Sequence, residues 1–173
     1  DADITMQNTS QTLLQNPPVA LAPLAGITDL PFRNLVSSFG ASFVVSEMVA
    51  SQEMVQAKKG VREKAELGFE SANTAVQLAG RDPYWMAEAA QMVADNGAQV
   101  IDINMGCPAK KVVGGLSGSA LMRDLDHALR MIEAVTAAVT LPVTLKTRLG
   151  WDDDSLNAAE LAQRAESAGV KRL

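Results

Sequence analysis

The sequence is poor in cysteine and histidine, with one residue of each among its 173. A single cysteine excludes a disulfide within the chain, and nothing else in the sequence points to an oxidising compartment. The one histidine, His127, falls in the middle of an expected helix, where a solvated surface position is the favoured interpretation. Cys107 has no histidine near it in the sequence, so a Cys–His hydrolase is not favoured.

Positive charge is also scarce, since 15 Lys and Arg residues face 20 Asp and Glu residues, and the pI is about 4.9. This balance argues against a broad basic surface for non-specific binding of nucleic acid, although a local basic groove is compatible with it. No apolar run is long enough to span a membrane. Residues 1–17 form a polar tail without the features of a signal peptide, so the cytoplasm is the expected location.

Short apolar runs alternate with helical patterns over the rest of the chain, 18–173. Strands are expected at 19–25, 43–49, 74–80, 100–106 and 143–149, and helices at 30–40, 51–59, 82–97, 119–139 and 155–169. Thr28 or Asp29 is placed to cap the first helix. Asp82, Pro83 and Gly97 mark the start and end of the clearest one. A repeat of strand and helix predicts a parallel sheet covered by helices.

Two α/β architectures compete for this pattern, an open doubly wound sheet and a (β/α)8 TIM barrel. The first strand–helix turn lacks the glycine fingerprint of a dinucleotide-binding sheet. Polar residues gather instead at several strand ends, which is typical of a barrel: Gln77, Asn104, Cys107, Lys146 and Arg148. A barrel needs eight units and about 250 residues. The chain is therefore expected to supply the first five units of a barrel, either as a piece of a longer protein or as a poorly folded fragment.

The segment INMGCPAKKVVGG, Ile103–Gly115, carries the single cysteine. Gly106 and Pro108 flank Cys107 and end the preceding strand, which places the thiol on a loop at a strand end. A thiol in that position can act as a nucleophile or as a general acid. A buried, inert thiol is the alternative, but the loop setting favours a chemical role.

Other polar residues interrupt apolar strands. Lys146 and Arg148 share one face of a strand, so they point into a catalytic mouth or reach solvent from the strand end. Gln77, Asn104 and Glu47 each need a hydrogen-bond partner there. A planar heterocycle would supply a partner for Gln77.

Two further segments have weaker signals. GGLSG, 114–118, precedes an expected helix and could cradle a phosphate, but it lacks the ending of a P-loop and a flexible loop is favoured. WDDD, 151–154, is more typical of a polar loop that caps the next helix than of a metal site, because adjacent aspartates cannot all face one ion. No metal site is therefore expected.

Six ordered segments resemble those of the tRNA-dihydrouridine synthases: LAPLAGITDLPFR, SEMV, VQLAG, DINMGCPAKKV, GSALMRD and LKTRLGW. The sequence GCPAKKV is most similar to the bacterial subfamily called DusB or NifR3-like. The resemblance covers nearly all of the chain, from about residue 18 to residue 173.

The resemblance implies an FMN-binding barrel, followed by a small helical domain, that reduces the C5=C6 bond of particular uridines in tRNA with NADPH as reductant. It implies that Cys107 is the general acid that gives a proton to C5. The implied FMN-binding residues are Pro23, Leu24 and Ala25 against the ring, Gln77 at its pyrimidine edge and Lys146 near its N1/O2 side. The residues expected to contact tRNA are Asn104, Lys110, Lys111 and Arg148. The later barrel segments and the C-terminal domain of the family do not occur in these 173 residues.

Two other readings of the sequence stay open. The chain could come from another FMN-dependent barrel reductase of the dihydroorotate or enoate type, which substrate profiling would distinguish. A truncated barrel could also bind RNA or a partner without turnover, in which case the purified protein would lack flavin.

Overall fold

The computed structural model describes residues 19–41, 43–56, 65–66 and 74–173. The polar tail expected at 1–17 lies outside these residues. Within them, no helix is long and apolar enough to cross a membrane.

The described strands form one parallel sheet. They are β1 (Ala20–Leu21), β2 (Phe43–Val45), β3 (Val49–Ala50), β4 (Thr74–Ala79), β5 (Val100–Met105) and β6 (Val143–Thr147). The sheet order is β1-β2-β4-β5-β6, and β3 pairs with β4 next to β2. β2 and β3 both pair with β4, and the other strands lie beside their sequence neighbours, without the reversal of order that defines a doubly wound sheet.

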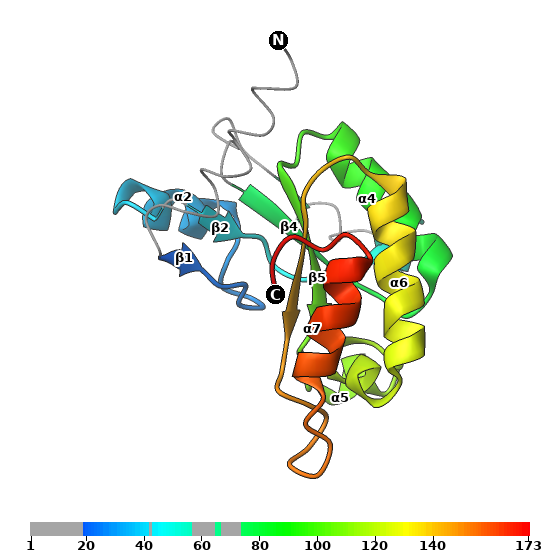
Figure 1. Cartoon of the computed structure of the whole chain (residues 1–173). Coiled ribbons are helices and arrows are strands. Elements are labelled where there is room, and N and C mark those ends of the chain that lie inside the picture. The colour runs from blue at the N-terminus through cyan, green and yellow to red at the C-terminus, as the bar shows by residue number, and fades with distance from the viewer. Residues whose placement is uncertain (1–18, 42, 57–64, 67–73) are drawn as a thin grey trace.

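The strands curl into part of a barrel (Figure 1), which confirms the predicted fold class. Residues after the last helix begin a further unit, because Lys171 donates its N–H to the carbonyl of Val143 at 2.8 Å. Arg172 forms a parallel bridge with Thr144. The described residues thus supply five strand–helix units and the start of a sixth.

Helices connect the strands. They are α2 (Leu30–Ser38), α3 (Ser51–Val55), α4 (Pro83–Asp95), α5 (Lys110–Val113), the 3-10 helix η3 (Gly118–Arg123), α6 (Leu125–Ala138) and α7 (Ala158–Ser167). The predicted caps are confirmed, because the side chains of Asp29 and Asp82 accept the N–H groups of Phe32 and Tyr84. Figure 1 shows α4, α6 and α7 on one side of strands β4 to β6.

The single strand expected at 43–49 is wrong, because the structure divides it into β2 and β3. Val45 pairs with Ala75 and Val49 pairs with Leu78, so four steps on one strand match three on the other. The extra residue makes a bulge. A bulge depends on the register of the partner strand, and the apolar pattern of one strand does not reveal it.

The expected helix at 119–139 is also wrong, because it is two elements. Asp124 has a non-helical backbone between η3 and α6, with φ −142° and ψ 87°, and its side chain accepts the N–H of His127 at 2.9 Å. An aspartate that caps a helix competes with continuation of the previous one. The short helix α5 was not expected. The first strand, expected at 19–25, is only two residues long, and residues 25–27 form a turn.

The sheet separates two apolar clusters. The larger one packs the outer side chains of the strands against the helices, for example Ile103 against Met86 and Ile132, all fully buried. The smaller one lies on the inner face and contains Phe43, Val45, Ala75 and Val100. Apolar side chains on both faces are expected for strands of a barrel. The inner face changes from apolar to polar toward the carboxyl ends of the strands, where the candidate site lies.

Candidate active site

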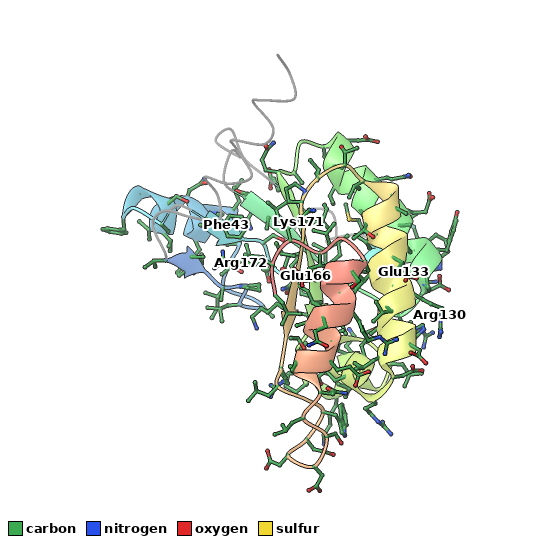
Figure 2. All side chains as sticks on the ribbon, in the orientation of Figure 1. Phe43, Arg130, Glu133, Glu166, Lys171 and Arg172 are labelled. Carbon is green, nitrogen blue, oxygen red and sulfur yellow. The ribbon has the colours of Figure 1, made fainter. Side chains whose placement is uncertain are left out.

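An open groove of about 540 Å³ lies over the inner face of the sheet between β1 and β6. Its wall is mainly apolar and includes Pro23 and Phe43. Lys146 and Arg148 supply positive charge at the carboxyl end of β6. Figure 2 shows Phe43 on the side of β1 and β2, whereas Arg130 lies on the outer helix α6. The groove therefore combines an apolar wall with cations at the end of the sheet where barrel enzymes have their active sites.

Cys107 lies on the loop after β5, beside this edge of the sheet, and its side chain is partly buried. Its N–H donates to Oδ1 of Asn104 at 3.1 Å, and its carbonyl accepts the N–H of Ser119 at 3.0 Å. Nε of Arg148 donates to the neighbouring carbonyl of Gly106 at 2.7 Å. These hydrogen bonds use backbone atoms of the loop, so they fix the position of the thiol without involving its sulfur.

Gly118 allows η3 to approach the Cys107 loop. Its φ is +61°, and a Cβ atom there would lie 2.6 Å from the carbonyl oxygen of Cys107 and 2.8 Å from Cγ1 of Val112. Both the left-handed backbone and the close contact require glycine. The GGLSG segment thus closes the loop of the thiol, a role that the sequence pattern did not suggest.

Gly118→Ala should lower the free energy of unfolding by about 2–4 kcal/mol, because the methyl group meets a fixed backbone oxygen in a strained conformation. The matched control is Gly40→Ala, where φ is +98° and no atom lies within 4 Å of the added Cβ. That change should cost about 1 kcal/mol. Urea unfolding of both variants measures the difference, and equal losses would show that the contact with Cys107 is unimportant.

Buried polar side chains connect β4, β5 and β6 next to the thiol. Nδ2 of Asn104 donates to Oε1 of Gln77 at 2.8 Å, and Nε2 of Gln77 donates to Oδ2 of Asp102 at 2.6 Å. The hydroxyl of Thr144 donates to Oδ1 of Asp102 at 2.6 Å. These side chains are at most 7% exposed. The protein itself therefore supplies partners for Gln77, where the sequence had suggested a bound heterocycle.

Burial raises the pKa of the Asp102 carboxyl. The hydrogen bonds from Thr144 and Gln77 and the charge of Lys146 oppose that change. Sequence reasoning missed Asp102 and Thr144. The available signal was the alternation of Asp102 with Asn104 in an apolar strand, which places both side chains on the inner face.

The predicted cationic residues occupy two places. Lys146 is exposed and pairs in register with Asn104 on the adjacent strand, so it lies next to the polar cluster and on the groove. Lys110 and Lys111 are exposed on α5. Lys111 lines a second cavity of about 530 Å³, together with Arg81. The structure thus brings Lys146 and Arg148 together, and separates them from the α5 pair.

The predicted ring-contact residues form a turn after β1. Pro23 lines the groove, whereas Leu24 and Ala25 are exposed. The turn is held by Thr28, whose hydroxyl accepts the N–H of Leu24 at 3.0 Å. Oε1 of Glu47 accepts the N–H of Gly26 in the same turn. Glu47 is therefore the residue that attaches this turn to the bulge between β2 and β3.

His127 has no hydrogen bond to Cys107 among the described contacts. Its Nε2 lies 2.7 Å from the carbonyl oxygen of Arg81, and its Nδ1 lies 3.2 Å from Nη2 of Arg130. The ring thus links α6 to the loop after β4, where the sequence had suggested a solvated position. Within the described ranges, no group of three His, Cys, Asp or Glu side chains is placed to hold a metal ion.

Comparison with known proteins identifies relatives of the whole described region. The family model described as dihydrouridine synthase (Dus) matches residues 20–173. A protein of Rhodobacter capsulatus named "Probable tRNA-dihydrouridine synthase" is 68% identical over 163 residues, which cover 94% of this chain and 50% of the relative. The "tRNA-dihydrouridine synthase B" of Vibrio cholerae is 49% identical over 153 residues, covering 88% and 48%. The resemblance found in the sequence is confirmed.

The chain spans about half the length of the curated relatives it matches. A solved structure assigned as a phosphonomutase of Burkholderia cenocepacia J2315 aligns with 98% of this chain and 72% of its own at a TM-score of 0.61. At 20% sequence identity this similarity concerns the fold alone.

Proposed function

Because the chain belongs to the dihydrouridine synthase family, we propose that it is the part of a tRNA-dihydrouridine synthase that holds the catalytic thiol. The reaction is the reduction of the C5=C6 bond of specific uridines in tRNA, with FMN as cofactor and NADPH as reductant. The observation that carries the proposal is the position of Cys107, which lies on a rigidly bonded loop at the carboxyl end of β5, beside a groove with cations. The cytoplasm, where tRNA is modified, is the proposed location.

In this reaction Cys107 donates a proton to C5 of the uracil ring, as a general acid. The proton must arrive on a fixed trajectory, so the thiol has to be held in place before the base arrives. The hydrogen bonds to Asn104, Ser119 and Arg148 hold the loop in this way. A partly buried thiol with a fixed backbone is suited to that role because little reorganisation is needed when the base binds.

The residues of the groove fit a flavin. Its apolar wall, including Pro23, suits the faces of a planar ring, and Lys146 supplies a cation at its polar end. When bound, FMN supplies the hydride that C6 receives. Lys146 would favour negative charge on the cofactor. Gln77 is 1% exposed and is not part of the groove lining, so its proposed contact with a ring edge would have to use the one N–H of Nε2 that its bond to Asp102 leaves free. Leu24 and Ala25 would cover the ring from the turn after β1.

We propose two groups of tRNA contacts. Lys110 and Lys111 are exposed on α5 and would bind phosphates. Asn104 and Arg148 are tied to the Cys107 loop and would contact the extruded base through the N–H groups that they retain. A base taken out of folded tRNA needs such contacts, since extrusion costs a few kcal/mol.

The test is the dihydrouridine content of total tRNA, measured by mass spectrometry in cells with and without the gene. The proposal expects the modified base to disappear at defined positions when the gene is removed. Reintroduction of the intact gene should restore it. Unchanged dihydrouridine in cells without other members of the family would contradict the proposal. Turnover of free dihydroorotate or an enoate by the purified protein would instead favour the other class of flavin reductase.

A further inference from the structure

We propose that Asp102 is a positioning residue, which sets the direction of the hydrogen-bond chain that ends on the Cys107 loop. The inference rests on the proposed function, since it concerns how the proposed catalytic thiol is held. This hydrogen-bond chain consists of two amide side chains, with a backbone N–H at one end and a carboxyl group at the other. Its members are the backbone N–H of Cys107, the side chains of Asn104 and Gln77, and the carboxyl group of Asp102.

The end of the hydrogen-bond chain at the Cys107 loop can only donate hydrogen bonds. The N–H groups of Cys107 and Gly106 both point at Oδ1 of Asn104, at 3.1 and 3.3 Å. A backbone N–H has no acceptor role, so the oxygen of the Asn104 side chain must face the loop. Its nitrogen then faces Gln77, and the oxygen of Gln77 has to accept.

The opposite end of the hydrogen-bond chain, the carboxyl group of Asp102, accepts a hydrogen bond. Oδ2 of Asp102 faces Gln77, and it accepts when the carboxyl group is ionised. It also accepts when a proton sits on Oδ1, because the hydroxyl of Thr144 can accept that proton's hydrogen bond. The nitrogen of Gln77 must therefore face Asp102. Both ends of the hydrogen-bond chain require the same orientation of both amides, and the three side chains are at most 7% exposed, so water competes little with these bonds.

Moving the carboxylate from position 102 to position 104, on the other side of Gln77, should reverse the orientation of the Gln77 amide. In the variant Asn104→Asp, a carboxylate replaces the amide and faces Oε1 of Gln77, so two acceptors meet and the bonds to the Cys107 loop are strained. Adding Asp102→Asn removes the conflict. Gln77 can then turn its amide over, donate to the new carboxylate at position 104 and accept from the new amide at position 102, so that every buried group has a partner. The double variant should therefore repair the defect of the single one.

The experiment measures how fast iodoacetamide alkylates Cys107 in the intact protein. Trypsin releases this cysteine on the peptide 82–110, so mass spectrometry follows it separately from any other thiol. Rates are compared at pH values where they no longer rise with pH, which removes differences in thiol ionisation. The assay needs neither flavin nor tRNA, so its outcome is independent of whether the protein reduces uridine.

Asn104→Asp should raise the alkylation rate about fivefold, the factor expected from loss of one buried hydrogen bond that holds the loop. The double variant should return within about twofold of the original protein. The control is Thr144→Val, which removes the other bond to Asp102 and should leave Cys107 within about twofold. All three changes lie in buried strands, so Thr144→Val also controls for general loosening of the sheet.

The proposal would be overturned if Cys107 in the double variant were alkylated as fast as in Asn104→Asp, or faster. If residues 102 and 104 acted independently, the effects of the two substitutions on the alkylation rate would add instead of cancelling. The same holds if Thr144→Val exposes the thiol as strongly as Asn104→Asp, or if no variant changes the rate. Should Asn104→Asp yield no folded protein, folding becomes the readout. A folded double variant then supports the reversed chain, and an unfolded one overturns it.

Discussion

Replacing Cys107 by alanine should slow uridine reduction by about 10²–10⁴-fold, the range typical for loss of a general acid. The same variant should bind FMN and accept electrons from NADPH at close to the original rate, because the thiol takes no part in those steps. Pre-steady-state absorbance measurements separate the two half-reactions. One follows reduction by NADPH, and the other follows reoxidation by tRNA that lacks dihydrouridine.

The substitution should leave the loop intact. The bonds that hold it involve the N–H and carbonyl of residue 107 and the carbonyl of Gly106, and alanine keeps all of them. Cys107→Ser is the matched control for shape, since a hydroxyl group of similar size is a much weaker acid than a thiol. Unchanged uridine reduction in the alanine variant would remove Cys107 from the mechanism. An equal loss in both half-reactions would instead point to damage to the flavin site.

Much of the fold could be predicted because its signals are local. Asp82, Pro83 and Gly97 define α4 within one segment of sequence, and the structure places the helix at Pro83–Asp95. Polar residues at several strand ends also favoured a barrel, and the sheet order β1-β2-β4-β5-β6 agrees with that prediction. Signals of this kind need no knowledge of which strand lies beside which.

The errors arose where a neighbouring strand or helix decides the outcome. The bulge between β2 and β3 exists because the segment from Val45 to Val49 is one residue longer than the segment of β4 that it pairs with. The partners of Gln77 depend on its register with Asp102 and on the spacing of Asn104 along β5. A pattern of apolar residues predicts which face a side chain occupies. It does not predict which polar side chain on the next strand will meet it.

For the candidate site, the sequence indicated which residues lie at the strand ends but did not indicate which side chains they contact. Lys146 and Arg148 do reach one groove. Gln77 and Asn104, however, are also bonded to each other and to Asp102, so two residues expected as ligand contacts belong to a buried support as well. Asp102 completes that support and had no separate signal beyond its place in an apolar strand.

Lys146→Ala should weaken FMN binding about 10- to 100-fold, the range expected when a hydrogen bond from a charged group to a ligand is lost. Lys146 is exposed on the groove and pairs in register with Asn104, so its charge lies beside the polar end of the proposed ring site. Titration of the flavin-free protein with FMN, followed by quenching of flavin fluorescence, measures the affinity directly.

The matched control for this prediction is Lys110→Ala, which removes an equally positive and exposed side chain from α5, away from the groove lining. It should leave FMN affinity unchanged and weaken tRNA binding, whereas Lys146→Arg should retain most of the FMN affinity because the charge remains. If Lys146→Ala and Lys110→Ala bind FMN equally well, the groove between β1 and β6 does not hold the polar end of the flavin. The opposite result would assign the flavin to the inner face of β6, on the same edge of the sheet as the loop of Cys107.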